Sequence, residues 1–450
     1  MDVVILAAGL GTRMKSKLPK VLHRIFDKPI IDYVIDSAKE LDPSSVFVVV
    51  NPSLNEVIEH LKNKNVKTVF QDEPKGTAHA LGVALPHLES EKVLVLNGDT
   101  PLIKSDTLLN FVKVFDENSI DMAVLSFYPK REHSYGRIIR NSKGEVEKIV
   151  EITDYSELQS DEANSGVYLI KREVLELIKE IRENPRKGEF YLTDIVEIAR
   201  AKGYKVDAYC MAEEDELIGI NTREELSFAM KYLRDRVVKE LMSKGVTFYD
   251  PDSVWISPSV KIGQDTVIYP NVLLEGDTKI GHSCVIYQGV RIRNSIIEDR
   301  VQIKDCTVIE GSNIKSGSTI GPFAHIRPES VIGKECRIGN FVEVKKSVIG
   351  DSTKAAHLSY IGDAEVGNNV NIGAGTITCN YDGKKKHKTI IEDEVFIGSD
   401  TQLVAPVRVG KGAYIGAGST ITKDVPEDAL AISRTPQRNI EGWAKKKREE

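Results

Sequence analysis

Cysteine is scarce in this chain, and its five cysteines are scattered along the sequence, at Cys210, Cys284, Cys306, Cys336 and Cys379. No two of them form a Cys-x-x-Cys pair, so the sequence suggests neither a zinc site nor a disulfide framework. We therefore expect reduced, mostly buried thiols.

Long apolar segments and a strong net charge are also lacking. No run of about 18 apolar residues occurs, and the N-terminus, Met-Asp-Val-Val-Ile-Leu-Ala-Ala, lacks the basic start and longer apolar core of a signal peptide. We expect a cytoplasmic protein without membrane insertion. The 61 basic and 67 acidic side chains give a net charge of -6, which argues against a nucleic-acid partner.

The chain of 450 residues is longer than one hydrophobic core usually supports, and its glycine usage changes along the sequence. Twelve glycines lie in residues 1–245, whereas twenty lie between 251 and 420. Between these parts, residues 223–244 carry apolar side chains at the spacing of one amphipathic helix. We predict four segments, which are a first domain at 1–222, a linker helix at 223–246, a second domain at 247–436 and a tail at 437–450.

The first part alternates apolar runs typical of strands with segments of helical periodicity. The runs lie at residues 3–6, 46–50, 66–70, 93–96 and 122–127, and the helical segments include 30–41 and 108–115. Strands that lack in-out alternation and are separated by helices predict a parallel sheet covered on both faces, which is a Rossmann-like α/β fold. Ligands of such sheets bind beyond the carboxyl ends of the strands.

The second part repeats a branched aliphatic residue every six positions, from 262 to 292 and from 308 to 344. A period of six suits neither an α-helix nor a simple strand. It is typical of a parallel β-helix in which this residue points inward and stacks from coil to coil. The period shifts at residues 297–303, 354–360 and 381–389. We interpret the shifts as insertions that leave the coil as loops, where solenoids usually place function.

A glycine-containing turn follows the first predicted strand, in Leu6-Ala-Ala-Gly-Leu-Gly-Thr-Arg-Met, and leads to Pro19-Lys20. Small residues such as Ala8 and Gly9 let backbone N–H groups approach a triphosphate, while Arg13 and Lys20 supply positive charge to the transferring phosphoryl group. The turn lacks the third glycine of a dinucleotide fold and the Gly-Lys-Ser/Thr of a P-loop, so neither of those sites is indicated.

Polar residues follow other predicted strands at the same edge of the sheet, at Gln71, Gly76-Thr77 and Asn97-Gly98-Asp99. Asp99 is the natural Mg²⁺ ligand among them, because magnesium takes few protein oxygens together with waters and substrate phosphates. Taken alone, Asp99 fits an ordinary turn residue and Lys20 a surface lysine. Their convergence on one sheet edge favours a site.

The motifs Leu-Ala-Ala-Gly-x-Gly-Thr-Arg-Met, Leu-Pro-Lys-Val-Leu-His and Asn-Gly-Asp-Thr-Pro-Leu resemble those of sugar-phosphate nucleotidylyltransferases. Joined to the hexapeptide repeat, the chain resembles the family of bifunctional N-acetylglucosamine-1-phosphate uridylyltransferases and glucosamine-1-phosphate N-acetyltransferases over nearly its whole length. The resemblance implies a left-handed β-helix. It also implies acetylation of glucosamine-1-phosphate with acetyl-CoA, followed by transfer of UMP from UTP to N-acetylglucosamine-1-phosphate with release of pyrophosphate. The product would serve peptidoglycan and lipopolysaccharide synthesis.

For the uridylyl site, the resemblance implies three groups of residues besides the catalytic Arg13 and Lys20. The nucleotide is bound by Leu6, Ala8, Gly9 and Asp99, and the uracil base is read by Gln71, Gly76 and Thr77. The sugar is held by Gly136, Glu151, Asn164 and Asn221, and Asn221 also joins Asp99 on Mg²⁺. Asn97 stands where some relatives carry an aromatic residue, which leaves its contacts with the base open.

For the acetyl site, His357 lies in Lys-Ala-Ala-His-Leu-Ser-Tyr-Ile-Gly-Asp, within one of the shifts of the repeat. Amide formation from an amino sugar and a thioester needs a base, and an imidazole suits that role. The resemblance casts His357 as this base, although an isolated histidine also fits a structural role and the sequence does not identify its orienting partner. The implied sugar-phosphate residues are Arg327, Lys345, Tyr360, Asn371 and Lys386. The implied acetyl-CoA residues are Ala374, Asn380, Tyr381, Ser399, Ala417 and Arg434.

Members of this family form trimers with the acetyl site between neighbouring solenoids, which predicts a homotrimer here. Two alternatives stay open at this point. In one, the chain performs nucleotidyl transfer only and the β-helix serves regulation or assembly. In the other, the whole chain is a non-enzymatic scaffold.

Overall fold

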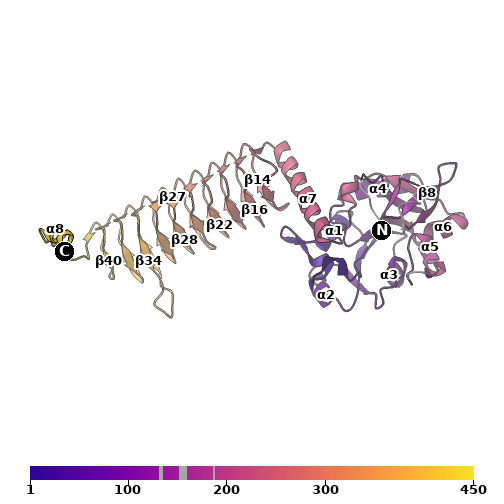
Figure 1. Cartoon of the computed structure of the whole chain (residues 1–450), viewed down its shortest axis with the longest axis horizontal. Helices are drawn as coiled ribbons and strands as arrows, with labels where there is room; N and C mark the ends of the chain where they lie inside the picture. Colours follow the sequence, from indigo (N-terminus) through magenta and orange to yellow (C-terminus); the bar gives the residue numbers. More distant parts are fainter. Residues whose placement is uncertain (131–134, 152–159, 186–187) are drawn as a thin grey trace. The chain divides into compact units, whose positions relative to one another are not determined.

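A computed structural model of the chain describes residues 1–130, 135–151, 160–185 and 188–450 (Figure 1). The chain divides into two compact units, Met1–Leu233 and Arg234–Glu450. The boundary falls inside helix α7 (Arg223–Ser243), which occupies the segment predicted as one long helix. The domain limits at residues 222, 246 and 436 stay a prediction.

The first unit is built on a sheet whose main strand order is β11-β7-β10-β6-β1-β4-β5. These strands are β1 (Asp2–Leu6), β4 (Ser45–Val50), β5 (Lys67–Phe70), β6 (Lys92–Asn97), β7 (Met122–Phe127), β10 (Ala163–Lys171) and β11 (Val206–Cys210). Strand β1 is parallel to β4 and β6, β4 to β5, and β7 to β11, as the sequence predicted.

Strand β10 departs from the prediction of a parallel sheet, because it runs antiparallel between β6 and β7. The chain reaches β10 from β7 through the antiparallel pair β8 (Arg137–Arg140) and β9 (Val146–Val150). A parallel return would need a crossover, usually a helix, and the described residues between β7 and β10 contain none. The Rossmann-like sheet is therefore mixed.

Helices cover both faces of this sheet, as the uniformly apolar strands predicted. They are α1 (Ile30–Lys39), α2 (Asn55–Leu61), α3 (Thr77–Ala84), α4 (Ser105–Glu117), α5 (Arg172–Leu175) and α6 (Asp194–Ala201). In β1, Val4 packs into the core that contains residues of α3 and α6, whereas Val3 packs into the core that contains residues of α1 and α4. Within the described ranges, no helix is both long and apolar enough to cross a membrane.

The second unit is a β-helix of three parallel sheets with 11, 10 and 9 strands (Figure 1). The first sheet runs from β12 (Thr247–Phe248) to β41 (Leu430–Ala431), the second from β13 (Trp255–Ile256) to β40 (Thr420–Ile421), and the third from β14 (Lys261–Ile262) to β38 (Val407–Val409). Each coil supplies one strand to each sheet. The predicted left-handed parallel β-helix of hexapeptide repeats is confirmed.

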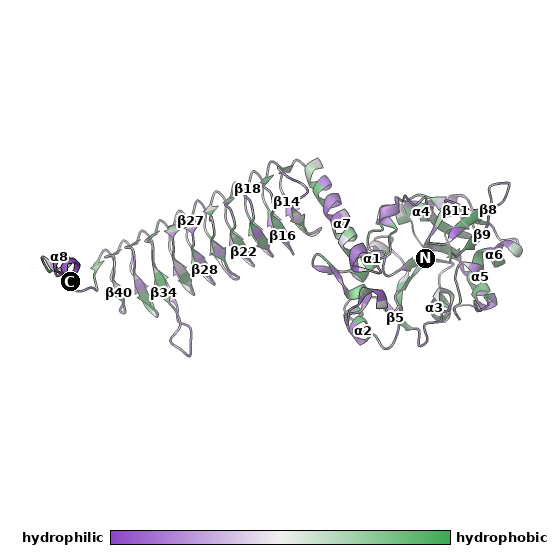
Figure 2. Ribbon diagram, in the orientation of Figure 1, coloured by the Kyte–Doolittle hydropathy of each residue, from purple (hydrophilic) through white to green (hydrophobic). Residues whose placement is uncertain are grey.

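The inward positions of the coils are those that the period of six predicted, and Figure 2 shows apolar residues recurring in every coil. Ile268, Ile320 and Ile338 are fully buried. Val308 is an exception, because its neighbour Ile309 is the buried residue. The cores of the coils merge into one continuous cluster.

Two of the three shifts in the repeat are one-residue shortenings, so their interpretation as insertions was wrong. Lys261 pairs with Lys279, 18 positions on, whereas Lys279 pairs with Ile296 and Val331 with Val348, only 17 positions on. At these corners a residue with positive φ precedes a buried serine whose hydroxyl bonds a backbone carbonyl, and the turn closes one residue early. Asn294 and Ser295 form one such corner, and Lys346 and Ser347 form another.

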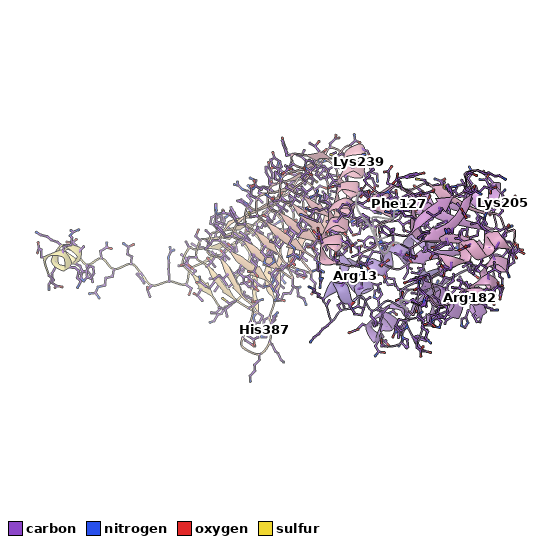
Figure 3. The ribbon with its side chains drawn as sticks, turned by 45° about the vertical axis from the view of Figure 1, so that its right-hand side comes forward. Arg13, Phe127, Arg182, Lys205, Lys239 and His387 are labelled. Atoms are coloured by element: carbon purple, nitrogen blue, oxygen red, sulfur yellow. The ribbon has the colours of Figure 1, made fainter. Side chains whose placement is uncertain are left out.

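The third shift is an insertion, as predicted. Ala364 pairs with Thr389, 25 positions on, and the extra residues leave the coil as a loop in which Figure 3 labels His387. Asp382 organises the loop by accepting hydrogen bonds from the backbone N–H groups of Lys384 and Lys385 and from the ring of His387. These bonds, first that of Lys385, lower the pKa of Asp382.

The cysteines are free, but the expectation that most are buried was wrong. Cys284 and Cys336 are buried, and their Sγ atoms lie 3.0 Å from backbone carbonyls of the next coil. Cys210 and Cys306 are exposed, because Cys210 ends an edge strand and Cys306 occupies a corner with positive φ. Cys379 is half-buried.

Candidate active sites

The first unit contains a cavity of about 440 Å³ at the carboxyl ends of its parallel strands. Three backbone bonds gather the loops there, from Ala7 N–H to Val49, from Gly98 N–H to Leu6 and from Gln71 N–H to Val50. The sequence-predicted residues that line the cavity are Leu6, Ala8, Gly9, Arg13, Lys20, Gln71, Gly76, Thr77, Asp99 and Asn221. The structure thus brings together the motifs that the sequence placed on one sheet edge.

Lys20, Asp99 and Asn221 form the charged centre of this cavity. The Lys20 Nζ atom lies 2.5 Å from Asp99 Oδ2 and 2.9 Å from Asn221 Oδ1, and the Lys20 side chain is only 12% exposed. Gly11 permits this placement, since its φ is 64° and a Cβ there would lie 2.5 Å from Lys20 Cβ. Two hard oxygens from distant parts of the sequence therefore converge on one cationic position.

The side-chain amide of Gln71 has a fixed orientation in the wall of the cavity. Its Nε2 atom lies 3.2 Å from the Gly76 carbonyl oxygen, which can only accept, so the NH₂ group must face that oxygen. The same Nε2 lies 2.9 Å from His79 Nδ1, which accepts the second N–H. The Gln71 Oε1 atom is left as the acceptor available to a ligand.

The predicted sugar residues, Gly136, Glu151 and Asn164, do not line the cavity, but they lie together beside it. The Asn164 N–H donates to the Gly136 carbonyl at 2.9 Å, and a Cβ on Gly136 would lie 3.6 Å from the Glu151 carboxyl carbon. Their sequence neighbours Tyr135 and Ser165 do line the cavity.

Tyr135 was missed by the sequence analysis, although it directly precedes the predicted sugar residue Gly136. Its hydroxyl accepts a hydrogen bond from the Gly219 N–H at 3.1 Å, close to Asp99. Burial raises the pKa of Tyr135 to about 12, so the hydroxyl stays protonated. Asn97, whose contacts with the base the sequence left open, also lines the cavity, as do Glu189 and Glu225, which the sequence analysis did not name.

In the second unit, His357 ends strand β30 (Lys354–His357) and does not lie in an inserted loop. Its Nδ1 atom lies 2.9 Å from Oδ1 of Asn340, the residue directly opposite it in β27 (Arg337–Asn340) of the preceding coil. Asn340 is thus the partner that the sequence did not identify. The sequence did not show that residues 17 positions apart are paired at this point of the β-helix, so Asn340 could not be identified.

Four of the predicted sugar-phosphate residues, Arg327, Lys345, Tyr360 and Lys386, form one cluster. The ammonium group of Lys345 lowers the pKa of Lys386, and the Glu343 carboxylate, 2.7 Å from Arg327, raises the pKa of that guanidinium. The Tyr360 hydroxyl is 3.5 Å from Asn380 Nδ2, which donates to Asp363 at 2.5 Å.

Among the residues that the structure describes, Asn371 has no contact that joins it to this cluster. It pairs with Lys354, at the end of β30 opposite to His357.

The predicted acetyl-CoA residues Ala374, Ser399 and Ala417 continue a column that begins at His357. Ala355, Ile372, Ile397 and Ile415 are register partners in successive coils, and each column residue lies two positions after one of them. Arg434, which lies three residues after Ala431, the register partner of Ile415, donates a hydrogen bond to the Ala417 carbonyl at the end of the column. Asn380 is buried, whereas Tyr381 is 61% exposed at the base of the inserted loop.

Comparisons with known families agree with this arrangement. The first unit matches the MobA-like NTP transferase domain over residues 3–189. The second matches the GMPPB C-terminal domain over residues 251–331 and six bacterial transferase hexapeptide repeats over residues 388–423. Fold and sites together define a nucleotidyltransferase that is joined to a hexapeptide-repeat transferase.

The chain belongs to the family of bifunctional GlmU proteins. It is 74% identical over 452 residues to the bifunctional protein GlmU of Thermodesulfovibrio yellowstonii, with 100% of both chains covered. It is 44% identical to that of Alkaliphilus metalliredigens, over 99% of this chain and 98% of the relative. A crystal structure of UDP-glucose pyrophosphorylase with UDP-glucose is 20% identical, with a TM-score of 0.43 over 52% of this chain and 98% of that chain.

This membership confirms the family predicted from the sequence. The chain is a bifunctional enzyme of UDP-N-acetylglucosamine synthesis, with an N-acetyltransferase and a uridylyltransferase in one polypeptide. The single-function and scaffold alternatives are set aside.

Proposed function

We propose that each unit carries one of the two reactions at the site described above. The solenoid acetylates glucosamine-1-phosphate with acetyl-CoA, and the cavity of the first unit then transfers UMP from UTP to N-acetylglucosamine-1-phosphate. The observation that carries this assignment is that each predicted set of catalytic groups assembles within its own unit. Thiol release and pyrophosphate release, measured in parallel on the intact protein, test it. Absence of thiol release from folded protein would contradict the acetyl-transfer part of this assignment.

In the cavity, a phosphate oxygen of the sugar attacks the α-phosphorus of UTP in line, and pyrophosphate leaves. Positioning and charge neutralisation dominate such a reaction. Arg13 and Lys20 offset the charge of the phosphates, and Gln71 Oε1 accepts from the N3–H of uracil. Gly136, Glu151 and Asn164 hold the sugar beside the cavity.

Asp99 and Asn221 would hold Mg²⁺ in this reaction. Their oxygens both contact the Lys20 ammonium, which supports the view that this pair accepts a cation between them. One carboxylate and one amide oxygen suit magnesium, which keeps waters and binds substrate phosphates. The ion supplies further charge neutralisation for the triphosphate.

In the solenoid, the amine of glucosamine-1-phosphate attacks the thioester carbonyl, so that an N–C bond forms and the C–S bond breaks. His357 takes the proton from the attacking nitrogen and delivers it to the leaving thiolate. Arg327, Lys345 and Lys386 bind the sugar phosphate.

The column that begins at His357 provides a track for acetyl-CoA. Three coil steps separate His357 from Ala417, or roughly 14 Å at a spacing of about 4.8 Å. The small side chains of Ala374, Ser399 and Ala417 leave room for an extended arm along this path, with Arg434 at its far end and Asn380 and Tyr381 beside the reacting centre.

Asn340 orients the base in this proposal, because its Oδ1 accepts the Nδ1–H of His357 and leaves the Nε2 lone pair for the substrate. We expect Asn340→Leu to lower kcat of acetyl transfer by about 10- to 100-fold in a thiol-release assay. Asn340→Asp retains an acceptor, so it should keep most of the rate. Its carboxylate stabilises the protonated imidazole, so the acid limb of the pH–rate profile should move to higher pH. A wild-type rate in Asn340→Leu would contradict the role.

A homotrimer is also part of the proposal, with neighbouring solenoids completing each acetyl site. Beside His357 and Asn340, Leu358, Phe341 and Phe323 are more than half exposed, and the two phenylalanine rings stack at 5.6 Å. Such an exposed apolar column suits burial against a second copy. Light scattering should give three times the chain mass of 50.0 kDa. A monomeric mass at micromolar concentration would refute the trimer.

The cytoplasmic location stays a prediction.

A further inference from the structure

His23 is buried and lies three residues after Lys20, directly beyond the single 3-10 turn η2 (Lys20–Leu22). Its Nδ1 atom lies 3.1 Å from Nη1 of Arg223, the first residue of α7. A guanidinium can only donate, so Nδ1 accepts and the ring is neutral, with its proton on Nε2. Burial, followed by the positive charge of Arg223, lowers the pKa of His23 and favours this neutral form.

The two residues end two short segments that also supply lining residues of the cavity, among them Lys20 and Asn221. His23 closes Leu-Pro-Lys-Val-Leu-His, and its N–H bonds the Lys20 carbonyl at 3.2 Å. Arg223 closes Gly-Ile-Asn-Thr-Arg, two residues after Asn221. Lys20 sits in a short 3-10 turn and Asn221 in the loop before α7, so a regular sheet holds neither residue.

The His23–Arg223 bond therefore joins two segments that meet again in the cavity, where Lys20 Nζ and Asn221 Oδ1 are 2.9 Å apart. Glu225 stabilises the Asn221 turn itself, because its carboxylate accepts hydrogen bonds from the backbone N–H groups of Asn221 and Thr222. A displacement of about 1 Å between catalytic groups can cost on the order of 10²-fold in rate.

We propose that His23 and Arg223 are positioning residues for uridylyl transfer, whose hydrogen bond fixes the Lys20 segment against the Asn221 turn. They set the distance between the ammonium group and the amide oxygen at the triphosphate and the metal, and neither touches the substrate. This inference rests on the function proposed for the cavity.

The test uses the intact protein with UTP, N-acetylglucosamine-1-phosphate and a series of Mg²⁺ concentrations. We expect His23→Leu and Arg223→Met each to lower kcat of pyrophosphate release about tenfold or more and to raise the Mg²⁺ concentration for half-maximal rate. The kcat of the double variant should be close to that of the slower single variant, because both changes remove the same hydrogen bond. His23→Asn offers an acceptor oxygen near the position of Nδ1 and should restore most of the rate.

Two controls separate positioning from general damage. Acetyl transfer by the same variants should be unchanged, and His87→Leu, at an exposed histidine of the same unit, should leave uridylyl transfer at the wild-type rate. If His23→Leu fails to fold, Arg223→Met alone tests the inference. Arg223 is exposed, so its replacement leaves the core unchanged. A kcat and Mg²⁺ dependence within about twofold of wild type in Arg223→Met would overturn the inference. Absence of pyrophosphate release from the wild type would instead overturn the function proposed for the cavity.

Discussion

Replacement of His357 by alanine is expected to lower acetyl transfer about 10²- to 10⁴-fold, the contribution typical of a general base. The side chain ends a regular strand and contacts Asn340 at the surface of the coil, so its removal leaves the inward stack of aliphatic residues intact. The solenoid should therefore keep its fold and lose only the acceptor for the amine proton. Thiol release from acetyl-CoA in the presence of glucosamine-1-phosphate measures the loss.

The second activity of the same polypeptide is the internal control for this variant. Uridylyl transfer to pre-acetylated sugar phosphate should proceed at the wild-type rate, because the groups of that reaction lie in the other unit. His282→Ala, at an exposed corner of an early coil, is a matched histidine variant and should affect neither reaction. If His357→Ala kept the wild-type rate of thiol release, the base would have to be sought elsewhere in the cluster around Tyr360.

The repeat could be predicted from the sequence because its period is a direct consequence of stacking. Each inward position needs a branched aliphatic residue, and that need recurs in every coil. The period alone, however, does not show whether a shift is a deletion or an insertion. In a repeat of six, the loss of one residue and the gain of five displace the inward positions by the same amount. For that reason the short corners at Ser295 and Ser347 were mistaken for insertions, whereas the loop at residues 381–389 was recognised.

The lining residues of the cavity could be predicted from the sequence where they directly follow a predicted strand. Lys20, Gln71 and Asp99 stand in or beside motifs at strand ends, and a parallel sheet brings such ends to one edge. The direction of β10 could not be predicted, because it depends on which strand the chain returns to. Residues that act through a neighbour, such as His23 and Asn340, could not be found either, because their partners are distant in sequence and only the folded chain sets the distance.

Asp99→Asn is expected to lower pyrophosphate release by about 10²- to 10³-fold, a loss comparable to that of one preorganised electrostatic contact in other enzymes. The carboxylate provides the only negative charge in the triad with Lys20 and Asn221, and an asparagine of the same shape removes this charge without opening a cavity. The backbone bond from Ile220 N–H to the Asp99 carbonyl does not depend on the side chain. The fold should persist, and acetyl transfer should be unchanged.

The Mg²⁺ dependence of this variant distinguishes two ways in which Asp99 could act. If the carboxylate chiefly attracts the metal, high Mg²⁺ should restore much of the rate, because an asparagine oxygen still ligates weakly. If it chiefly holds Lys20 in place, the rate should stay low at saturating Mg²⁺, since the ammonium group would have lost its ion-pair partner 2.5 Å away. Asp106→Asn, at the exposed start of α4, supplies the matched control. An unchanged rate and Mg²⁺ dependence in Asp99→Asn would remove Asp99 from the chemistry, and the charge of the transferring phosphoryl group would then have to be met by Arg13 and Lys20 alone.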